Sequence, residues 1–151
     1  MDFKNIKTAS FDDTEDITTL VIDSYKKYES VIGKKPAPML ANYEVLIKNN
    51  KVWKLIINNK IVGIVVIEEL KNNILLENIA VIPEYQGKGY GKLLLKFAES
   101  YGMKLKKNEI NLYTNIKMES NIRFYKNNQY EIIKEIEEEG YNRIYLSKKL
   151  K

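Results

Sequence analysis

Hydrophobic residues follow two different spacings along the chain, and each spacing predicts a different kind of element. Ile17, Leu20, Val21 and Tyr25 recur every three to four residues, which is typical of a helix with one buried face. Runs rich in β-branched and aromatic residues, bounded by Asn or Gly, predict strands instead. The full pattern predicts helices over 14–28, 39–48, 92–106 and 117–127, and strands over 3–7, 51–58, 60–70, 74–82, 109–114, 130–138 and 141–148.

The order of these elements predicts a fold class. Asn58-Asn59 joins two of the strands as a hairpin-type turn, and Gly140 lies where the last two strands meet. The order is β-α-α-β-β-β-α-β-α-β-β, so we expect an α/β protein with a mixed sheet whose first four strands are mostly antiparallel. A right-handed helical crossover would join the fourth strand to the fifth. The length predicts a single domain over residues 1–151.

The segment from the fourth predicted strand into the next helix is the most informative part of the chain. Strand 74–82 is almost continuously apolar, which suits a strand covered on both faces. The glycine-rich loop 86–91, Gln-Gly-Lys-Gly-Tyr-Gly, follows it, and a helix begins at once. Glycines let the backbone approach a phosphate closely, and a helix N-terminus offers unpaired N–H groups and a partial positive charge. The loop therefore predicts a site for a ligand that carries phosphates.

The absence of Cys and His from the sequence excludes several kinds of chemistry. The chain has no thiolate nucleophile, no Ser–His relay, and no thiolate or imidazole ligands for a metal. Acid–base work must therefore fall to Glu, Asp, Tyr, Lys or water. A covalent acyl-cysteine intermediate is impossible, so direct transfer between two bound substrates is the simpler mechanism for a group-transfer enzyme.

Charge and hydropathy narrow the expected partners. The net charge is +5 and the sequence pI about 9.1. The lysines are spread along the chain and form no basic stripe with interleaved aromatics, so we expect attraction for an anionic ligand but no nucleic-acid partner. No apolar run approaches the ~20 residues that span a bilayer, and residues 1–5 do not open a signal peptide. We therefore expect no membrane partner and a cytoplasmic location.

The glycine loop fits neither the dinucleotide fingerprint nor the P-loop. It resembles the acetyl-CoA signature Gln/Arg-x-x-Gly-x-Gly/Ala of the GNAT superfamily of N-acetyltransferases, which it matches at Gln86, Gly89 and Gly91. The patterns at 32–39, 114–121 and 140–146 are similar to those of a bacterial single-domain subgroup with no settled substrate. The resemblance covers essentially the whole chain. It implies acetyl-CoA as the cofactor and the GNAT fold, with a bulged fourth strand splayed from the fifth.

The same resemblance implies which residues hold the cofactor. The fourth strand would offer backbone groups at Ile79, Ala80 and Val81, which are also suitable as plain core residues. Asn121 would bond the pantetheine arm or position a neighbouring side chain, although it also suits a surface position. The pyrophosphate would lie on the glycine loop and the first helix residue after it, that is, on Gln86, Gly87, Lys88, Gly89, Tyr90, Gly91 and Lys92.

Two residues are candidates for acid–base catalysis. Tyr125 follows Phe124 as in the family's aromatic pair, which implies that it protonates the sulfur of coenzyme A; the alternative is a core aromatic. The resemblance also implies that Glu77 on the fourth strand is the best candidate for the base, because an acid on this strand often serves through water in the family; if it is buried, its pKa would be raised toward neutrality. An ordinary surface carboxylate is the alternative for Glu77, and Glu68 and Glu69 are weaker candidates.

Tyr25, Tyr28 and Met39 are candidates for the acceptor pocket, although such side chains at helical spacing are more often core. The sequence thus predicts an N-acetyltransferase that moves the acetyl group of acetyl-CoA directly to a primary amine in a ternary complex. The acceptor would be a small molecule or a peptide, and the enzyme a monomer or homodimer. A non-catalytic acyl-CoA-binding or sensing module of the same fold is the alternative. A third hypothesis, a nucleic-acid-binding protein, would be supported only by the net positive charge.

Overall fold

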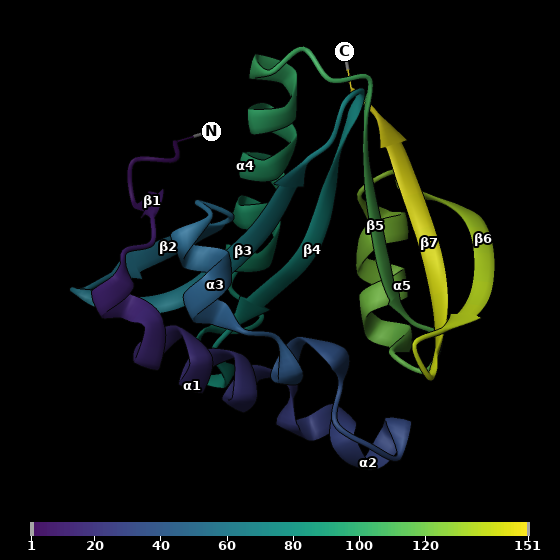
Figure 1. Cartoon of the computed structure of the whole chain (residues 1–151), viewed down its shortest axis with the longest axis horizontal. Coiled ribbons are helices and arrows are strands. Elements are labelled where there is room, and N and C mark those ends of the chain that lie inside the picture. The colour runs from purple at the N-terminus through teal and green to yellow at the C-terminus, as the bar shows by residue number, and fades with distance from the viewer. Residues whose placement is uncertain (1, 151) are drawn as a thin grey trace.

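A seven-stranded mixed sheet forms the centre of the computed structural model, which describes residues 2–150. The strand order is β1-β2-β3-β4-β5-β7-β6, and helices cover both faces (Figure 1). No helix within these residues is long and apolar enough to cross a membrane. The strands are β1 Ile6–Thr8, β2 Val52–Ile57, β3 Lys60–Glu69, β4 Asn73–Val81, β5 Glu109–Asn115, β6 Glu131–Glu138 and β7 Tyr141–Lys149. The helices are α1 Thr14–Tyr25, α2 Glu29–Ile32, α3 Tyr43–Lys48, α4 Tyr90–Lys104 and α5 Glu119–Asn127.

The pairing of the strands confirms the predicted topology. β1 to β4 pair antiparallel in sequence order, β4 pairs parallel with β5, and α4 makes the crossover between them. Asn58 and Asn59 both have positive φ, at 51° and 61°, as a tight β2–β3 hairpin turn requires. β7 then pairs antiparallel with both β5 and β6. The predicted mixed α/β sheet is therefore confirmed.

The predicted elements differ from the structure mainly between the first helix and the second strand. The helix expected over 14–28 ends at Tyr25, and a 3-10 turn over Lys26–Tyr28 leads into α2. The helix expected over 39–48 begins only at α3, because Asn42 caps it with its side chain and Ala37–Leu40 forms a separate 3-10 turn. The strand expected over 3–7 is shorter and later: β1 begins at Ile6 and ends at Thr8.

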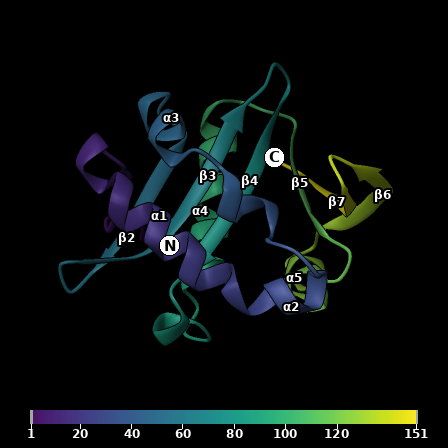
Figure 2. The same cartoon turned by 60° about the horizontal axis from the view of Figure 1, so that its bottom comes forward.

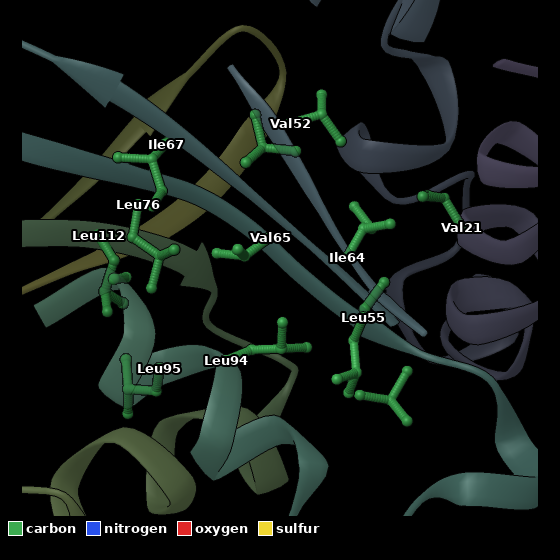
Figure 3. Packing of buried hydrophobic residues seen from close by; sticks show 14 of the residues in the cluster. Val21, Val52, Leu55, Ile64, Val65, Ile67, Leu76, Leu94, Leu95 and Leu112 are labelled. Atoms are coloured by element: carbon green, nitrogen blue, oxygen red, sulfur yellow. The ribbon is translucent and has the colours of Figure 1, made fainter. Parts of the chain in front are cut away.

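The hydrophobic core lies on both sides of β2, β3 and β4. Figure 3 shows Ile64 of β3 on the side of Val21 from α1, and Val65 on the side of Leu94 from α4. Ile64, Val65, Val21 and Leu94 are all fully buried. Alternation along the strand sends neighbouring side chains to opposite faces, so each face needs its own covering helix. Figure 2 shows α1 and α4 on these two opposite faces.

β4 and β5 separate along part of their length. They pair only over 73–76 and 109–112, although β4 continues to Val81 and β5 to Asn115. Figure 1 shows the two strands diverging toward the end where α2 lies. The half-sheet β5-β7-β6 therefore joins the rest of the sheet at one end only, and the predicted splay of the fourth strand is present.

The fourth strand also carries the predicted bulge. In the β3–β4 pairing Val66 is opposite Asn78 and Ile67 is opposite Leu76, so Glu77 is the extra residue. A bulge of this kind bends its strand and redirects side chains. It lies directly after the last residue that pairs with β5, which places Glu77 at the start of the splay.

Candidate active site

Two cavities lie in the region where β4 and β5 part, and they share four lining residues. The glycine-loop cavity, of about 390 Å³, is lined by the loop after β4 and by parts of α1, α4 and α5. The hairpin cavity, of about 220 Å³, is lined by β4, β5, the turn around Pro38 and the start of β7. Tyr25, Ile79, Asn121 and Tyr125 line both. Ligands bound in the two cavities would therefore meet at these four residues.

The glycine loop presents open main chain to its cavity. Gly87 and Gly89 have φ of +78° and +89°, a conformation that side chains strongly disfavour. A Cβ at either position would have no atom within 4 Å, so the space over both glycines is open. Gly89 is also the N-cap of the 15-residue helix α4, whose first N–H groups have no partner within the helix. With Lys27 and Lys92 on the same cavity, this cradle fits a diphosphate.

The main chain of β4 directs hydrogen-bond donors into the splay. The N–H of Ile82 donates to the carbonyl of Val62 on β3 at 2.9 Å. Successive residues of a strand point their N–H and C=O groups to opposite sides, so those of Ile79 and Val81 face away from β3. Because β5 has already left β4 at this point, the N–H groups of Ile79 and Val81 face a gap and not a neighbouring strand.

Side chains from α1 and the loop occupy the carbonyls of the same two residues. The carbonyl of Val81 accepts from Ser24 Oγ at 2.9 Å and from Gln86 Nε2 at 2.8 Å. The carbonyl of Ile79 accepts from the Tyr25 hydroxyl at 3.0 Å. These bonds anchor the end of β4 to α1 and hold Gln86 in place, while the N–H groups remain for a ligand.

Tyr125 lies on α5 at the junction of the two cavities. Its side chain is only 8% exposed, and the rings of Phe124 and Tyr130 pack edge-on against it with centroids 5.2 and 5.8 Å away. Burial raises the pKa of the Tyr125 phenol, so the hydroxyl keeps its proton at neutral pH. Asn121, one turn earlier on the same helix, lines both cavities as well.

Glu77, the bulge residue of β4, brings a carboxylate to the hairpin cavity. Its Oε2 atom is buried and has no hydrogen-bond partner among residues 2–150. Burial and the nearby charge of Glu68 raise the pKa of the Glu77 carboxyl above its usual range. Buried polar atoms are nearly always paired, so this oxygen marks a place for a ligand group that donates a hydrogen bond.

The opposite wall of the hairpin cavity carries a cation that is already paired. Arg143 of β7 is buried and donates from Nη1 to a Glu138 oxygen at 2.9 Å. Its guanidinium lies 4.3 Å from the centroid of the Tyr113 ring. The described part of the chain holds no cluster of three or more His, Cys, Asp or Glu residues that could bind a metal ion. The hairpin cavity therefore offers carboxylate and aromatic groups, with no metal cluster in residues 2–150.

Most of the residues predicted for the site line one cavity or both. The glycine-loop cavity alone contains Tyr28, Ala80, Val81, Gln86, Gly87, Gly89, Gly91 and Lys92. Tyr28 was expected in the acceptor pocket but lies on the other side, where its hydroxyl is 2.9 Å from Ser120 Oγ.

Three predicted residues line neither cavity. The Lys88 ammonium lies 5.6 Å from the Tyr85 ring, and the Tyr90 ring packs beside the same tyrosine. Met39 packs against the hydrophobic core. Its predicted helix starts only at Tyr43, and the 3-10 turn that contains Met39 places Ala37 and Pro38 on the cavity instead.

Several site residues were missed by reasoning from the sequence. Asn78 is buried, accepts from the Tyr25 hydroxyl at 2.5 Å and donates to the Tyr43 hydroxyl at 3.1 Å. Its signal was an amide next to Glu77 in a strand that is otherwise apolar over residues 74–82. Ser24 of α1 lies within a predicted helix, and its bond to Val81 joins residues 57 positions apart. No local pattern could have revealed that bond.

Fold and site together define a class of protein. A sheet splayed between two parallel strands exposes main-chain donors, a glycine loop and helix N-terminus offer a diphosphate cradle, and a protonated tyrosine lies between two cavities. These features suit a transferase that uses an acyl donor with a diphosphate-containing carrier and a second substrate beside it. The model of the acetyltransferase (GNAT) domain matches residues 48–132, more than half of the chain. The chain belongs to the acetyltransferase (GNAT) family.

Individual relatives agree with this assignment. The ribosomal protein bS18-alanine N-acetyltransferase of Haemophilus influenzae is 50% identical over 42 residues, which are 28% of this chain and 29% of that protein. The chain thus aligns with less than a third of that relative's length. The PaiA N-acetyltransferase of Thermoplasma acidophilum, solved in complex with coenzyme A, has a TM-score of 0.77 at 21% identity, covering 95% of this chain and 97% of that one. A GNAT-family acetyltransferase of Bacillus cereus has a TM-score of 0.73 at 25% identity, covering 97% and 96%.

Proposed function

We propose that the enzyme transfers the acetyl group of acetyl-CoA directly to a primary amine held in the hairpin cavity. The observation that carries this proposal is the junction of the two cavities at Ile79 and Tyr125. Two substrates bound side by side can react without a covalent enzyme intermediate, and the chain has no Cys to form an acyl-thioester with. Holding both reactants in one complex replaces a bimolecular encounter and so removes much of the barrier.

The proposed contacts of acetyl-CoA follow from the glycine-loop cavity. The open main chain at Gly87 and Gly89 and the start of α4 would hold the pyrophosphate, with Lys92 adding positive charge. The N–H groups of Ile79 and Val81 would bond the pantetheine arm and the thioester carbonyl, as donors already oriented toward developing negative charge. When bound, acetyl-CoA supplies an acetyl group on a thioester, which a neutral amine can attack.

The proposed acid and base lie on the two sides of that attack. Glu77 accepts the proton that the amine must lose, directly or through water, and its raised pKa suits a base that works near neutrality. Tyr125 supplies a proton to the departing sulfur as the amide bond forms and the carbon–sulfur bond breaks. Burial keeps the phenol protonated, and it raises the pKa of a thiolate beside it in the same way.

The experiment that tests this function is the substitution Tyr125→Phe. It removes one hydroxyl and keeps the ring, so we expect the kcat to fall by about a hundredfold or more. The Kd of acetyl-CoA, measured by calorimetry, should stay within about twofold, because the cradle is main chain. Initial rates of the wild-type enzyme at varied concentrations of both substrates should give intersecting lines, whereas parallel lines would indicate a covalent intermediate.

Tyr130→Phe is the matched control. Tyr130 is buried beside Tyr125, and its hydroxyl donates to Glu99 at 2.8 Å, outside both cavities. This variant should lose about 1–2 kcal/mol of stability and keep its kcat. If Tyr125→Phe leaves turnover unchanged, the acid role is wrong. If acetyl-CoA binds but no amine is acetylated, the chain is a binding or sensing module.

A further inference from the structure

The charged groups around the hairpin cavity favour a cation. Glu77, Glu139 and Arg143 line it, and Arg143 is held by Glu138 at 2.9 Å and by Glu139 at 3.8 Å. Arg143 therefore has its charge matched by carboxylates. The Glu77 carboxylate keeps a buried oxygen without a partner among the described residues. In a protein of net charge +5, this cavity is a locally acidic site, and an ammonium group is the ligand group that its free oxygen would take.

Three polar side chains of the cavity wall are bonded to one another. Asn78 accepts from the Tyr25 hydroxyl and donates to that of Tyr43, and the Tyr43 hydroxyl donates to the carbonyl of Pro38 at 2.6 Å. These bonds occupy polar atoms of Tyr25, Tyr43 and Asn78. The wall also has an apolar and aromatic part, which includes Pro36, Ala37, Leu46, Leu76, Tyr113 and Tyr141.

A strap joins the segment after α2 to the β6–β7 turn beside this cavity. We use this name for residues 33–36 together with Gly140 and Tyr141. The Tyr141 hydroxyl donates to the Lys35 carbonyl at 2.6 Å, and the Lys34 ammonium donates to the Gly140 carbonyl. The Lys34 ammonium also lies 4.1 Å from the centroid of the Tyr141 ring. Because Pro36 and Tyr141 line the cavity themselves, these contacts tie together two parts of its wall that come from the segment after α2 and from the β6–β7 turn.

The volume of the hairpin cavity limits the size of its ligand. A dry cavity of roughly 150 Å³ holds a benzene molecule. The hairpin cavity, of about 220 Å³, would hold a ring with a short aliphatic arm. An extended peptide would have to displace the strap, and a further ammonium group of a polyamine would find only Glu139, which already lies 3.8 Å from Arg143. Both would therefore bind less well than a compact amine.

We infer that the acceptor is a small cationic primary amine with one compact apolar or aromatic body, of the arylalkylamine class. Its ammonium lies at Glu77, and its body lies against the prolines and tyrosines under the strap. This inference rests on the proposed function and narrows it. It also separates this enzyme from relatives named for acetylating a ribosomal protein, because a protein N-terminus would require the strap to open.

The test compares three acceptors on the full-length enzyme with saturating acetyl-CoA, with release of the free thiol as the readout. The probes are phenethylamine, spermidine and a peptide with a free N-terminal alanine. We expect kcat/KM for phenethylamine to be at least tenfold above both others. The neutral isostere 2-phenylethanol should compete weakly with phenethylamine, with an inhibition constant at least tenfold above the KM of phenethylamine, because it lacks the positive charge. Preference for the peptide or for spermidine would overturn the inference and leave the proposed function standing. If the enzyme acetylates no amine at all, neither these three nor any other, both the inference and the proposed function are wrong.

A variant tests the strap separately. Tyr141→Phe removes the hydroxyl bond to Lys35 and keeps the ring, so the ratio of peptide to phenethylamine kcat/KM should rise severalfold. Tyr101→Phe is the control, since Tyr101 packs against Trp53 with ring centroids 4.9 Å apart and lines neither cavity. An unchanged ratio in Tyr141→Phe, with the melting temperature of the wild type, would contradict the role of the strap in selecting small acceptors.

Discussion

The glycine-loop cavity and the hairpin cavity meet at the same four residues but are built in opposite ways. Much of the first comes from one continuous segment, 79–92, and its central contacts are main-chain groups. The second combines side chains from a 3-10 turn, β4, β5, α5 and β7, with Pro36 and Arg143 more than a hundred residues apart in the chain. The first therefore suits one invariant ligand, and the second carries the choice of acceptor.

This difference has a physical basis. Backbone N–H groups are present at every residue except proline, so a cradle needs only glycines and a helix start to expose them. Recognition by side chains depends on which residues the fold brings together, as with Glu77, Tyr113 and Arg143. A substitution confined to one cavity should accordingly change one substrate's parameters and leave the other's alone.

Among substitutions confined to one cavity, the largest effect is expected from Glu77→Gln in the hairpin cavity. Its folded-state pKa is raised, so a base at this position is protonated in acid and kcat/KM of the wild type should fall there. The variant cannot accept a proton, so its kcat/KM at neutral pH should be about a hundredfold lower than that of the wild type. Its kcat/KM should fall toward acid pH (the acid limb of the profile) only as far as protonation of the amine substrate requires. The Kd of acetyl-CoA should not change, and pH–rate profiles with calorimetry would check both.

Stability distinguishes this chemical loss from unfolding. A carboxyl whose pKa is raised by folding stabilises the fold when it is protonated, and this contribution is lost as the pH rises through the folded-state pKa. Above that pKa the wild type carries a burial cost that Gln lacks. The melting temperature of Glu77→Gln at pH 8 should therefore be no lower than that of the wild type. A clearly lower value would mean that the carboxylate has a structural role.

An effect of intermediate size is expected in the glycine-loop cavity from Gly89→Glu. The new side chain forces a residue other than glycine into φ +89° and directs a carboxylate into the proposed phosphate site. We expect the Kd of acetyl-CoA to rise about thirtyfold, a loss of about 2 kcal/mol. The KM of the amine at saturating acetyl-CoA should stay near the wild-type value.

Gly33→Glu is a closely matched control for that variant. Gly33 also has φ +89° and open space around its Cβ position, but it caps α2 away from the glycine loop. Both variants should lose a similar 1–2 kcal/mol of stability from backbone strain. Only Gly89→Glu should weaken cofactor binding. Equal Kd values in the two variants would show that the loop does not hold the cofactor.

The parts of the molecule that the sequence predicted are the parts set by local patterns. The strand pairing, the crossover and the Asn58-Asn59 turn all follow from spacing and turn chemistry. The helix expected over 39–48 was drawn too long, because Asn42 acts as an N-cap through a bond that residue spacing does not reveal. Propensity describes each segment alone, whereas capping and packing decide where it begins.

The site divides in the same way. The cofactor residues could be proposed from one motif, since Gln86, Gly87, Gly89 and Gly91 are neighbours in sequence and all line one cavity. Tyr28 was expected on the acceptor side and lies on the other, because α1 gives way to a 3-10 turn that changes the helical phase. The strap joins residues 106 positions apart, and no spacing argument links such residues.

The smallest effect is expected from Glu68→Gln, which alters the hairpin cavity only through charge. Glu68 raises the pKa of Glu77 and forms an ion pair with Lys51 at 3.0 Å, and the Lys51 charge acts in the opposite direction. Removing the Glu68 charge ends the repulsion and frees Lys51, so both changes lower the pKa of Glu77. The acid limb of kcat/KM should move to lower pH, with a gain of about twofold at acid pH, as expected for a partly exposed charge.

Glu69→Gln is the control, because Glu69 pairs with Lys107 at 3.1 Å and neighbouring strand residues face opposite sides. A limb that moves equally in both variants would mean that net charge, and not the Glu68–Glu77 interaction, governs the ionisation of the base.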